Sequence, residues 1–155
     1  MSTVPVTVPE LVSVRLLAAD RVEAISELAD LLEQGGYVKP SFKTAVLERE
    51  VSFPTGLPTG EVGVAIPHAD SIHVLRSAVG VGLLEKPIRF LQMGDPDASI
   101  DVDLVLMLAI EDPKAVVPFL RKICSILQDG VLLQGIRTCN NPGEASVLLQ
   151  SRLNG

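Results

Sequence analysis

One uninterrupted apolar run, Leu104–Ile110, constrains the fold of this chain more than any other segment. A strand that is apolar at every position must be covered on both faces, because a half-exposed strand alternates apolar and polar residues. We therefore expect Leu104–Ile110 to be a central strand with packing on either side. The chain has 155 residues, 47% of them hydrophobic, which is enough for one domain with a sizeable core. We predict a single domain over residues 1–155, in which residues 1–10, with two prolines, form a loose N-terminal lead-in.

Helices and shorter strands are predicted around this run. Further strands are expected at Leu11–Leu17, Val64–Ile66 and Ala78–Leu84. A first helix is expected to start at Asp20 with Glu23 and to end at Gly35-Gly36, and a second to start at Pro40. A third is expected between Pro113 and Gly130, with Pro118 either in its first turn or before its start. A short helix is expected at Val131–Ile136, and a last one from Asn141-Pro142. Helices interleaved with strands predict an α/β (α+β) fold, in which helices cover both faces of a sheet.

The charge balance and the apolar pattern exclude several classes of protein. The formal net charge is −6 and no cluster of Lys and Arg is present, whereas a protein that binds nucleic acid needs a basic face. The first residues lack a basic region followed by an apolar one, and no apolar stretch approaches the roughly 18–20 residues of a membrane span. Cys124 and Cys139 do not indicate a disulfide scaffold. We therefore expect a cytoplasmic protein with reduced thiols that neither binds nucleic acid nor inserts into a membrane.

A histidine at the predicted end of a strand is the main candidate for chemistry. The run Val64–Ile66 is followed by Pro67, which cannot donate to a sheet ladder, and then by His68. The strand should therefore stop at Pro67 and present His68 on a rigid base, where its side chain can face solvent. Histidine exchanges protons and can act as a nucleophile near neutral pH. The chain has two histidines, and the second, His73, lies five residues further on.

Residues that can bind an oxyanion precede this histidine. Arg49 lies at the end of a predicted helix, just before a loop rich in glycine and proline. That loop can offer backbone N–H groups from around Gly56 and the hydroxyls of Thr55 and Thr59. A planar guanidinium matches phosphoryl oxygens, and phosphoryl transfer depends mainly on in-line positioning and charge neutralisation. Together with His68 these groups predict transient phosphorylation.

Each of these residues also has a purely structural interpretation. His68 could be a strand-end histidine without chemistry, Arg49 a solvated residue paired with its neighbouring glutamates, and His73 a residue of a surface turn. A third interpretation is a metal-dependent hydrolase that uses His68, Asp70 and His73. Their spacing is not that of a His pair one helical turn apart, and no third strong ligand is evident, so we predict no metal and no cofactor.

Four segments together resemble a known family. They are Arg49-Glu50, Phe53-Pro54-Thr55-Gly56, Val64-Ala65-Ile66-Pro67-His68 and Ile72-His73. This pattern is similar to the sugar-specific EIIA component of the bacterial phosphoenolpyruvate-dependent phosphotransferase system, in the fructose/mannitol superfamily, and most of all to its galactitol type. The resemblance covers roughly residues 10–150. It implies a mixed sheet sandwiched by helices on both faces.

The resemblance also implies a role for each site residue. His68 would be phosphorylated by phospho-HPr and would pass the group to a cysteine of an EIIB component. Arg49, Thr55 and Gly56 would bind the phosphoryl group, and His73 and Glu50 would support the site. Members of the superfamily usually have a second histidine at the start of the helix after the long buried strand. Here Pro113–Phe119 contains none, which fits the galactitol-like branch.

Two functions follow from these expectations, and only the first involves sugar uptake. The first is a phosphocarrier in sugar uptake, with galactitol as the sugar that the resemblance indicates. The alternative is a regulatory module whose phosphorylation state is sensed by another protein. A surface that docks two partners in turn should be partly apolar, and Leu57, Val64 and Val74 are the candidates. The sequence leaves open which nitrogen of His68 reacts.

Overall fold

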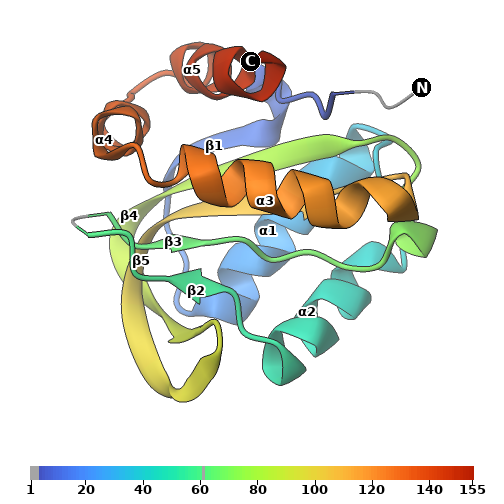
Figure 1. The fold of residues 1–155 in the computed structure, drawn as a ribbon, viewed down its shortest axis with the longest axis horizontal. Helices are drawn as coiled ribbons and strands as arrows, with labels where there is room; N and C mark the ends of the chain where they lie inside the picture. The colour runs from blue at the N-terminus through green and yellow to red at the C-terminus, as the bar shows by residue number, and fades with distance from the viewer. Residues whose placement is uncertain (1–3, 61) are drawn as a thin grey trace.

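Five strands form one mixed sheet in the computed structural model, which describes residues 4–60 and 62–155 (Figure 1). They are β1 (Val12–Leu16), β2 (Gly56–Leu57), β3 (Val64–Ala65), β4 (Ala78–Gln92) and β5 (Asp95–Ala109). Strands β4 and β5 form a long antiparallel hairpin, with β1 parallel to β4 and β3 parallel to β5. Strand β2 is antiparallel to β3 and also pairs with the outer end of β4, through Gly56 and Gln92. The hairpin therefore curls until four strands pair in a closed ring.

Helices cover both faces of this sheet (Figure 1). The helices are α1 (Arg21–Gln34), α2 (Phe42–Ser52), α3 (Val116–Ile126), α4 (Gly130–Arg137) and α5 (Pro142–Asn154), with short 3-10 turns η1 (Pro9–Leu11), η2 (Ser71–His73) and η3 (Pro113–Ala115). Residues of α1 and α2 pack into one apolar cluster, and residues of α3, α4 and α5 pack into another. The predicted mixed sheet between two helical layers is confirmed. Among the described residues, no helix is both long and apolar enough to cross a membrane.

Strand β5 divides the two clusters. Val105 and Met107 belong to the cluster under α1 and α2, whereas Leu104, Leu106 and Leu108 belong to the one under α3, α4 and α5. Successive side chains of a strand point to opposite faces, so an apolar run supplies both cores at once. The expectation of a central strand covered on both sides is confirmed.

Local capping determines most helix ends. Asp20 accepts a hydrogen bond from the Glu23 N–H at 2.9 Å, and the Asn141 side chain accepts from Gly143 and Glu144 at the start of α5. Pro118 is the third residue of α3, where a missing N–H costs little. Helix α2 begins at Phe42 after Ser41, two residues later than Pro40 predicted.

The hairpin is longer than the apolar pattern predicted. Strand β4 continues past Leu84 to Gln92, and β5 begins at Asp95. In this outer part only alternate residues are buried: Ile88 and Phe90 are covered and Arg89 is exposed. The outer half was missed because it leaves the doubly covered centre of the sheet, so its continuous apolar signal ends.

The N-terminal segment is more ordered than expected. Residues 1–3 lie outside the described residues, but Val6 pairs with Ala78 at the start of β4. The N–H of Thr7 donates to the Gln150 side chain of α5 at 2.7 Å. The prediction of a loose lead-in is therefore wrong for residues 4–10. Its prolines disfavour regular structure, but partners more than 70 residues away supply hydrogen bonds that no local pattern reveals.

Candidate functional site

His68 is anchored on the central strand of the sheet. Strand β3 ends at Ala65, and the chain continues beside β5, where Leu108 donates its N–H to the Pro67 carbonyl at 3.0 Å. His68 then forms a parallel bridge with Leu108. The prediction that the His68 side chain faces solvent is wrong, because only 8% of His68 is exposed. The histidine is thus held rigidly in a mostly covered position.

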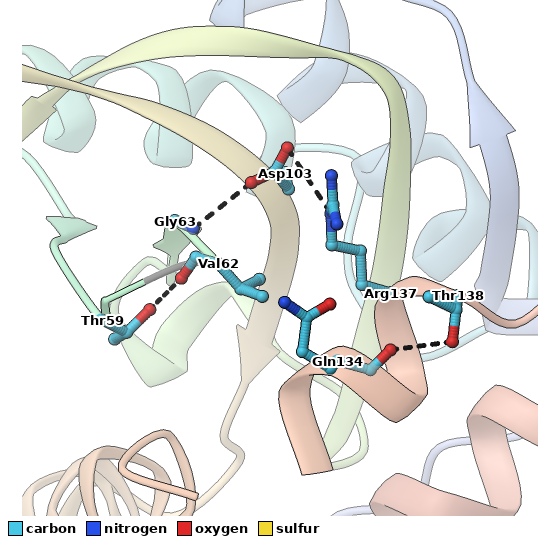
Figure 2. Close-up of polar contacts among 7 residues, drawn as sticks. All are labelled: Thr59, Val62, Gly63, Asp103, Gln134, Arg137 and Thr138. Atoms are coloured by element: carbon cyan, nitrogen blue, oxygen red, sulfur yellow. Dashed lines mark hydrogen bonds and ion pairs between the residues drawn. The ribbon is translucent and has the colours of Figure 1, made fainter. Parts of the chain in front are cut away.

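The other end of β3 is held by β5 and α4 (Figure 2). The Thr59 hydroxyl donates to the carbonyl of Val62, and the Gly63 N–H donates to Asp103 at 3.4 Å. Arg137 of α4 pairs with the same carboxylate at 3.8 Å. Thr59, which was expected to offer a hydroxyl to an oxyanion, here closes the turn that leads into β3.

One ring nitrogen of His68 has a backbone partner. Nδ1 lies 2.8 Å from the carbonyl oxygen of Ile66. A carbonyl can only accept, so Nδ1 carries the proton and Nε2 keeps its lone pair. Burial lowers the pKa of His68 and the Arg49 charge adds to this, whereas the Ile66 bond and Asp70 act in the opposite direction. The arrangement favours a neutral imidazole with Nε2 as the nucleophile.

Arg49, in the last turn of α2, supplies positive charge at His68. Its Nη1 lies 3.8 Å from a carboxylate oxygen of Asp70, and its guanidinium carbon lies 5.3 Å from the centre of the Phe53 ring. Its Nε is buried and has no hydrogen-bond partner among the described residues. A partly exposed guanidinium with an unused donor is suited to bind an anion. The contact with Asp70, 21 positions away in the sequence, was not predicted.

Buried contacts that support the site involve Glu50, Thr55 and Gly56. The Thr55 N–H and hydroxyl both donate to the Glu50 carboxylate, at 2.9 and 2.8 Å, and all three groups are buried. A side chain on Gly56 would place its Cβ 2.6 Å from the carbonyl oxygen of Leu91, so the close pairing of β2 with β4 requires glycine. Both Thr55 donors are thus engaged with Glu50. That Thr55 and Gly56 bind a phosphoryl group stays a prediction.

His73 contacts the start of helix α2. It ends the turn η2, and its Nδ1 lies 2.8 Å from the Ser41 hydroxyl. This contact ties η2 to α2, which carries Arg49 near its other end. Direct help from His73 to His68 stays a prediction, and the contact between His73 and Ser41 was not predicted.

The apolar surface differs from the one expected. Val64 and Val74 are buried, so their prediction as docking residues is wrong; Leu57 is half-buried. Large apolar side chains are exposed instead at Phe53, which contacts Arg49, and at Ile72 in η2. Both residues of β3 are buried, so neither of its side chains reaches the surface.

Metal ligation has no support from the geometry of the described residues. Among them, no group of three or more His, Cys, Asp and Glu side chains is arranged to hold a metal ion. Asp70, weighed as a ligand, contacts Arg49 instead. The imidazole of His68 and the guanidinium of Arg49 therefore combine a nucleophile with a cation, a pair suited to an anionic group in transfer.

Two proteins of known description are similar in sequence to this chain. The galactitol-specific EIIA component of Escherichia coli K12 is 29% identical over 119 residues, which are 77% of this chain and 79% of that protein. The transcriptional regulator ManR of Bacillus subtilis is 30% identical over 105 residues, 68% of this chain but 15% of the regulator.

A solved structure and a family model extend the match to nearly the whole chain. The complex of enzyme IIAMTL and phosphorylated enzyme IIBMTL from Escherichia coli contains a chain that superposes with a TM-score of 0.75, at 26% identity, covering 92% of this chain and 95% of that one. The family model for the phosphoenolpyruvate-dependent sugar phosphotransferase system, EIIA 2, matches residues 6–151. The chain therefore belongs to this EIIA family, whose members are phosphotransferases that carry a phosphohistidine.

Proposed function

We propose that this protein carries a phosphoryl group on Nε2 of His68, received from phospho-HPr and delivered to a cysteine of an EIIB component. The observation that carries the proposal is the hydrogen bond from Nδ1–H to the Ile66 carbonyl, which leaves Nε2 as the free nucleophile. The galactitol-specific relative and the IIA–IIB complex support an EIIB partner and uptake of a galactitol-like sugar. Both cysteines are free, which fits a reducing cytoplasm.

The chemistry needs no group beyond the side chains. The Nε2 lone pair attacks the phosphorus of the donor phosphohistidine in line, the donor's P–N bond breaks, and the donor ring leaves with that electron pair. No proton moves at His68, because Nδ1–H stays bonded to Ile66 while the ring gains positive character. In the second step the new P–N bond breaks as a cysteine thiolate attacks, and neutral His68 is restored.

Arg49 is the group we assign to the phosphoryl oxygens. Its guanidinium is already within electrostatic reach of His68, and its Nε lacks a partner among the described residues. An arriving phosphoryl group, with more negative charge than the Asp70 carboxylate, competes for this cation. Arg49 would thus neutralise charge that develops between donor and acceptor.

Intact mass spectrometry after a reconstituted relay tests the proposal. The protein is incubated with phosphoenolpyruvate, enzyme I and HPr, and compared with the variants His68→Gln and His73→Ala. We expect a gain of one phosphoryl group in the unmodified protein and in His73→Ala, and none in His68→Gln. The label should be acid-labile and base-stable. Label that persists in His68→Gln would falsify the assignment.

A regulatory role is the second candidate, supported by one observation. A protein described as a transcriptional regulator contains a region that is 30% identical to this chain. The two roles differ in what receives the phosphoryl group. Transfer from the labelled protein to a purified EIIB of the galactitol type, measured by loss of label here and gain there, supports transport; label retained here despite active EIIB supports regulation.

A further inference from the structure

A series of hydrogen bonds leads from the buried carboxylate of Glu50 to the ring of His68. Both Thr55 donors bind that carboxylate, at 2.9 and 2.8 Å. The Thr55 carbonyl accepts the N–H of Ile66 at 3.3 Å. The Ile66 carbonyl accepts Nδ1–H of His68 at 2.8 Å. Two residues, Thr55 and Ile66, therefore link the nucleophile to a carboxylate on helix α2, although Glu50 does not touch the ring.

We propose that Glu50 is a positioning residue for His68. Its two hydrogen bonds with Thr55, called the clamp below, fix the place of Ile66. The Ile66 carbonyl then orients the imidazole and selects its tautomer. The inference rests on the proposed function of His68. It assigns Glu50 and Thr55 a task other than binding the phosphoryl group. Through this clamp, helix α2 holds both the cation Arg49 and, indirectly, the nucleophile.

The clamp is needed because the strands beneath His68 are short. Strand β3 pairs with β2 through Gly56–Ala65 and Leu57–Val64 and with β5 through Val64–Leu104 and Ala65–Val105, while β2 pairs with β4 at a single position. Pro67 has no N–H to add to the ladder. With only two residue pairs on each side, the position of β3 depends on few hydrogen bonds, each of which contributes only about 0.5–1.5 kcal/mol net. On the β2 side, the two further bonds from Thr55 to Glu50 therefore add to the few contacts that locate Ile66.

The coupling acts through position and not through charge. Consecutive bonds in the series share a residue but not a peptide group, so polarisation does not pass along it directly. The charged groups that shift the pKa of His68 are Arg49 and Asp70, while those facing Glu50 are Arg49 and, from α1, Arg21. Burial raises the pKa of Glu50, and the bonds from Thr55 oppose this effect. A neutral side chain that keeps both contacts to Thr55 should therefore keep the effect on His68.

The ring of His68 in the unphosphorylated protein provides the test. Nitrogen-15 NMR of histidine-labelled protein distinguishes an imidazole protonated at Nδ1 from one protonated at Nε2. Glu50→Ala removes the clamp. Glu50→Gln retains it, because its amide oxygen can accept the Thr55 N–H and its NH₂ can donate to the Thr55 hydroxyl. Glu48→Ala, an exposed glutamate of the same helix, is the matched control.

We expect Glu50→Ala to reduce the population protonated at Nδ1 and to slow phosphorylation by HPr about tenfold to a hundredfold, as misplacement of a reacting group does. Glu50→Gln and Glu48→Ala should retain both the tautomer and the rate. A folded Glu50→Ala with the unmodified tautomer overturns the inference. Loss of the tautomer in Glu50→Gln as well overturns the claim that position is what matters.

Variants of Thr55 keep the test valid if Glu50→Ala does not fold. Thr55→Val preserves volume and the backbone bond but removes the hydroxyl, whereas Thr55→Ser keeps it. Thr55→Val should weaken the Nδ1 preference and Thr55→Ser should not; identical spectra for the two overturn the inference. Because the NMR measurement needs no phosphate donor, failure of the relay assay contradicts the proposed function alone.

Discussion

At the scale of single residues, the site combines a buried imidazole with a partly exposed guanidinium. Burial removes water from His68 and favours its neutral form, while the Ile66 carbonyl holds the proton on Nδ1. Arg49 stays close enough to act on His68 but contacts the exposed Asp70 carboxylate only at 3.8 Å. Exposed ion pairs contribute little, so Arg49 can exchange this partner for a phosphoryl group at low cost.

The pH dependence of phosphorylation follows from the lowered pKa of His68. The rate should be constant above pH 6.5, the ordinary value for histidine, and should fall only on further acidification, when the ring gains a proton. Stability depends on pH in the same direction. Because the pKa of His68 is lower in the folded protein than in the unfolded chain, its contribution to stability is present above pH 6.5 and is lost as the pH falls through the folded-state pKa. An NMR titration measures the pKa of the His68 ring. Denaturant unfolding at several pH values, with His68→Gln as the control, measures its contribution to stability. A His68 that titrates above 6.5 contradicts this prediction.

Arg49 should matter for transfer and not for folding. Arg49→Gln should slow phosphorylation of His68 by about 10–1000-fold, the range for losing one electrostatic stabiliser, with little change in melting temperature. Arg49→Lys should restore only part of the rate, because a point charge does not reproduce the planar fork. Arg89→Gln, an exposed arginine paired with Asp101 on the outer hairpin, is the control and should react normally. Unchanged kinetics in Arg49→Gln would make Arg49 a surface ion-pair residue.

At the scale of elements, the short strand β3 is positioned by contacts at both of its ends. Gly63 approaches the backbone of β5 so closely that a Cβ there would lie 1.9 Å from the Asp101 carbonyl oxygen. The Asp103 carboxylate, which also pairs with Arg137 of α4, accepts the Gly63 N–H (Figure 2). At the other end, Pro67 and His68 join β5 at Leu108. The position of β3, and with it the position of His68, therefore depends on where β5 lies.

Substitution of Gly63 should displace β3 and damage the site at a distance. Gly63→Ala should lower the free energy of unfolding by roughly 1–3 kcal/mol or more, because the backbone of β5 cannot yield as a flexible side chain can. Phosphorylation of His68 in the folded fraction should also slow. Gly130→Ala is the matched control, since a Cβ there meets nothing within 4 Å, and it should be neutral or stabilising. Equal stability of the two variants would show that β3 moves without cost.

At the scale of the whole molecule, one strand serves two cores. The side chains of β5 alternate between the cluster under α1 and α2 and the cluster under α3, α4 and α5. Disturbing either cluster therefore moves the strand that carries Leu108 and, through it, His68. The two helical layers should unfold together as a single domain.

Truncations on the two faces of β5 test this cooperativity. Leu106→Ala and Met107→Ala should each lower the free energy of unfolding by about 2–5 kcal/mol, because both side chains are almost fully buried. Each variant should show one transition, seen alike by circular dichroism and by NMR of either layer. The control is Val131→Ala in α4, where the side chain is 86% exposed, and it should change the free energy of unfolding little. Two separate transitions would contradict a single domain.

The sequence by itself determined those features that depend on neighbouring residues. The apolar run Leu104–Ile110 specified a doubly covered strand because side-chain alternation is a property of the strand itself. Asp20 and Asn141 specified helix starts because a cap acts over two or three residues. The apolar run before Pro67 located strand β3, which ends at Ala65, one residue earlier than predicted.

Only the tertiary structure decided what surrounds the His68 ring. The contacts of Arg49 with Asp70 and of His73 with Ser41 join residues 21 and 32 positions apart, and no local pattern encodes them. The proton on Nδ1 depends on a 2.8 Å contact with a backbone carbonyl, whose place depends on how β3 lies against its neighbours. The lowered pKa of His68 comes mainly from burial, which exists only once both helical layers have packed on the sheet.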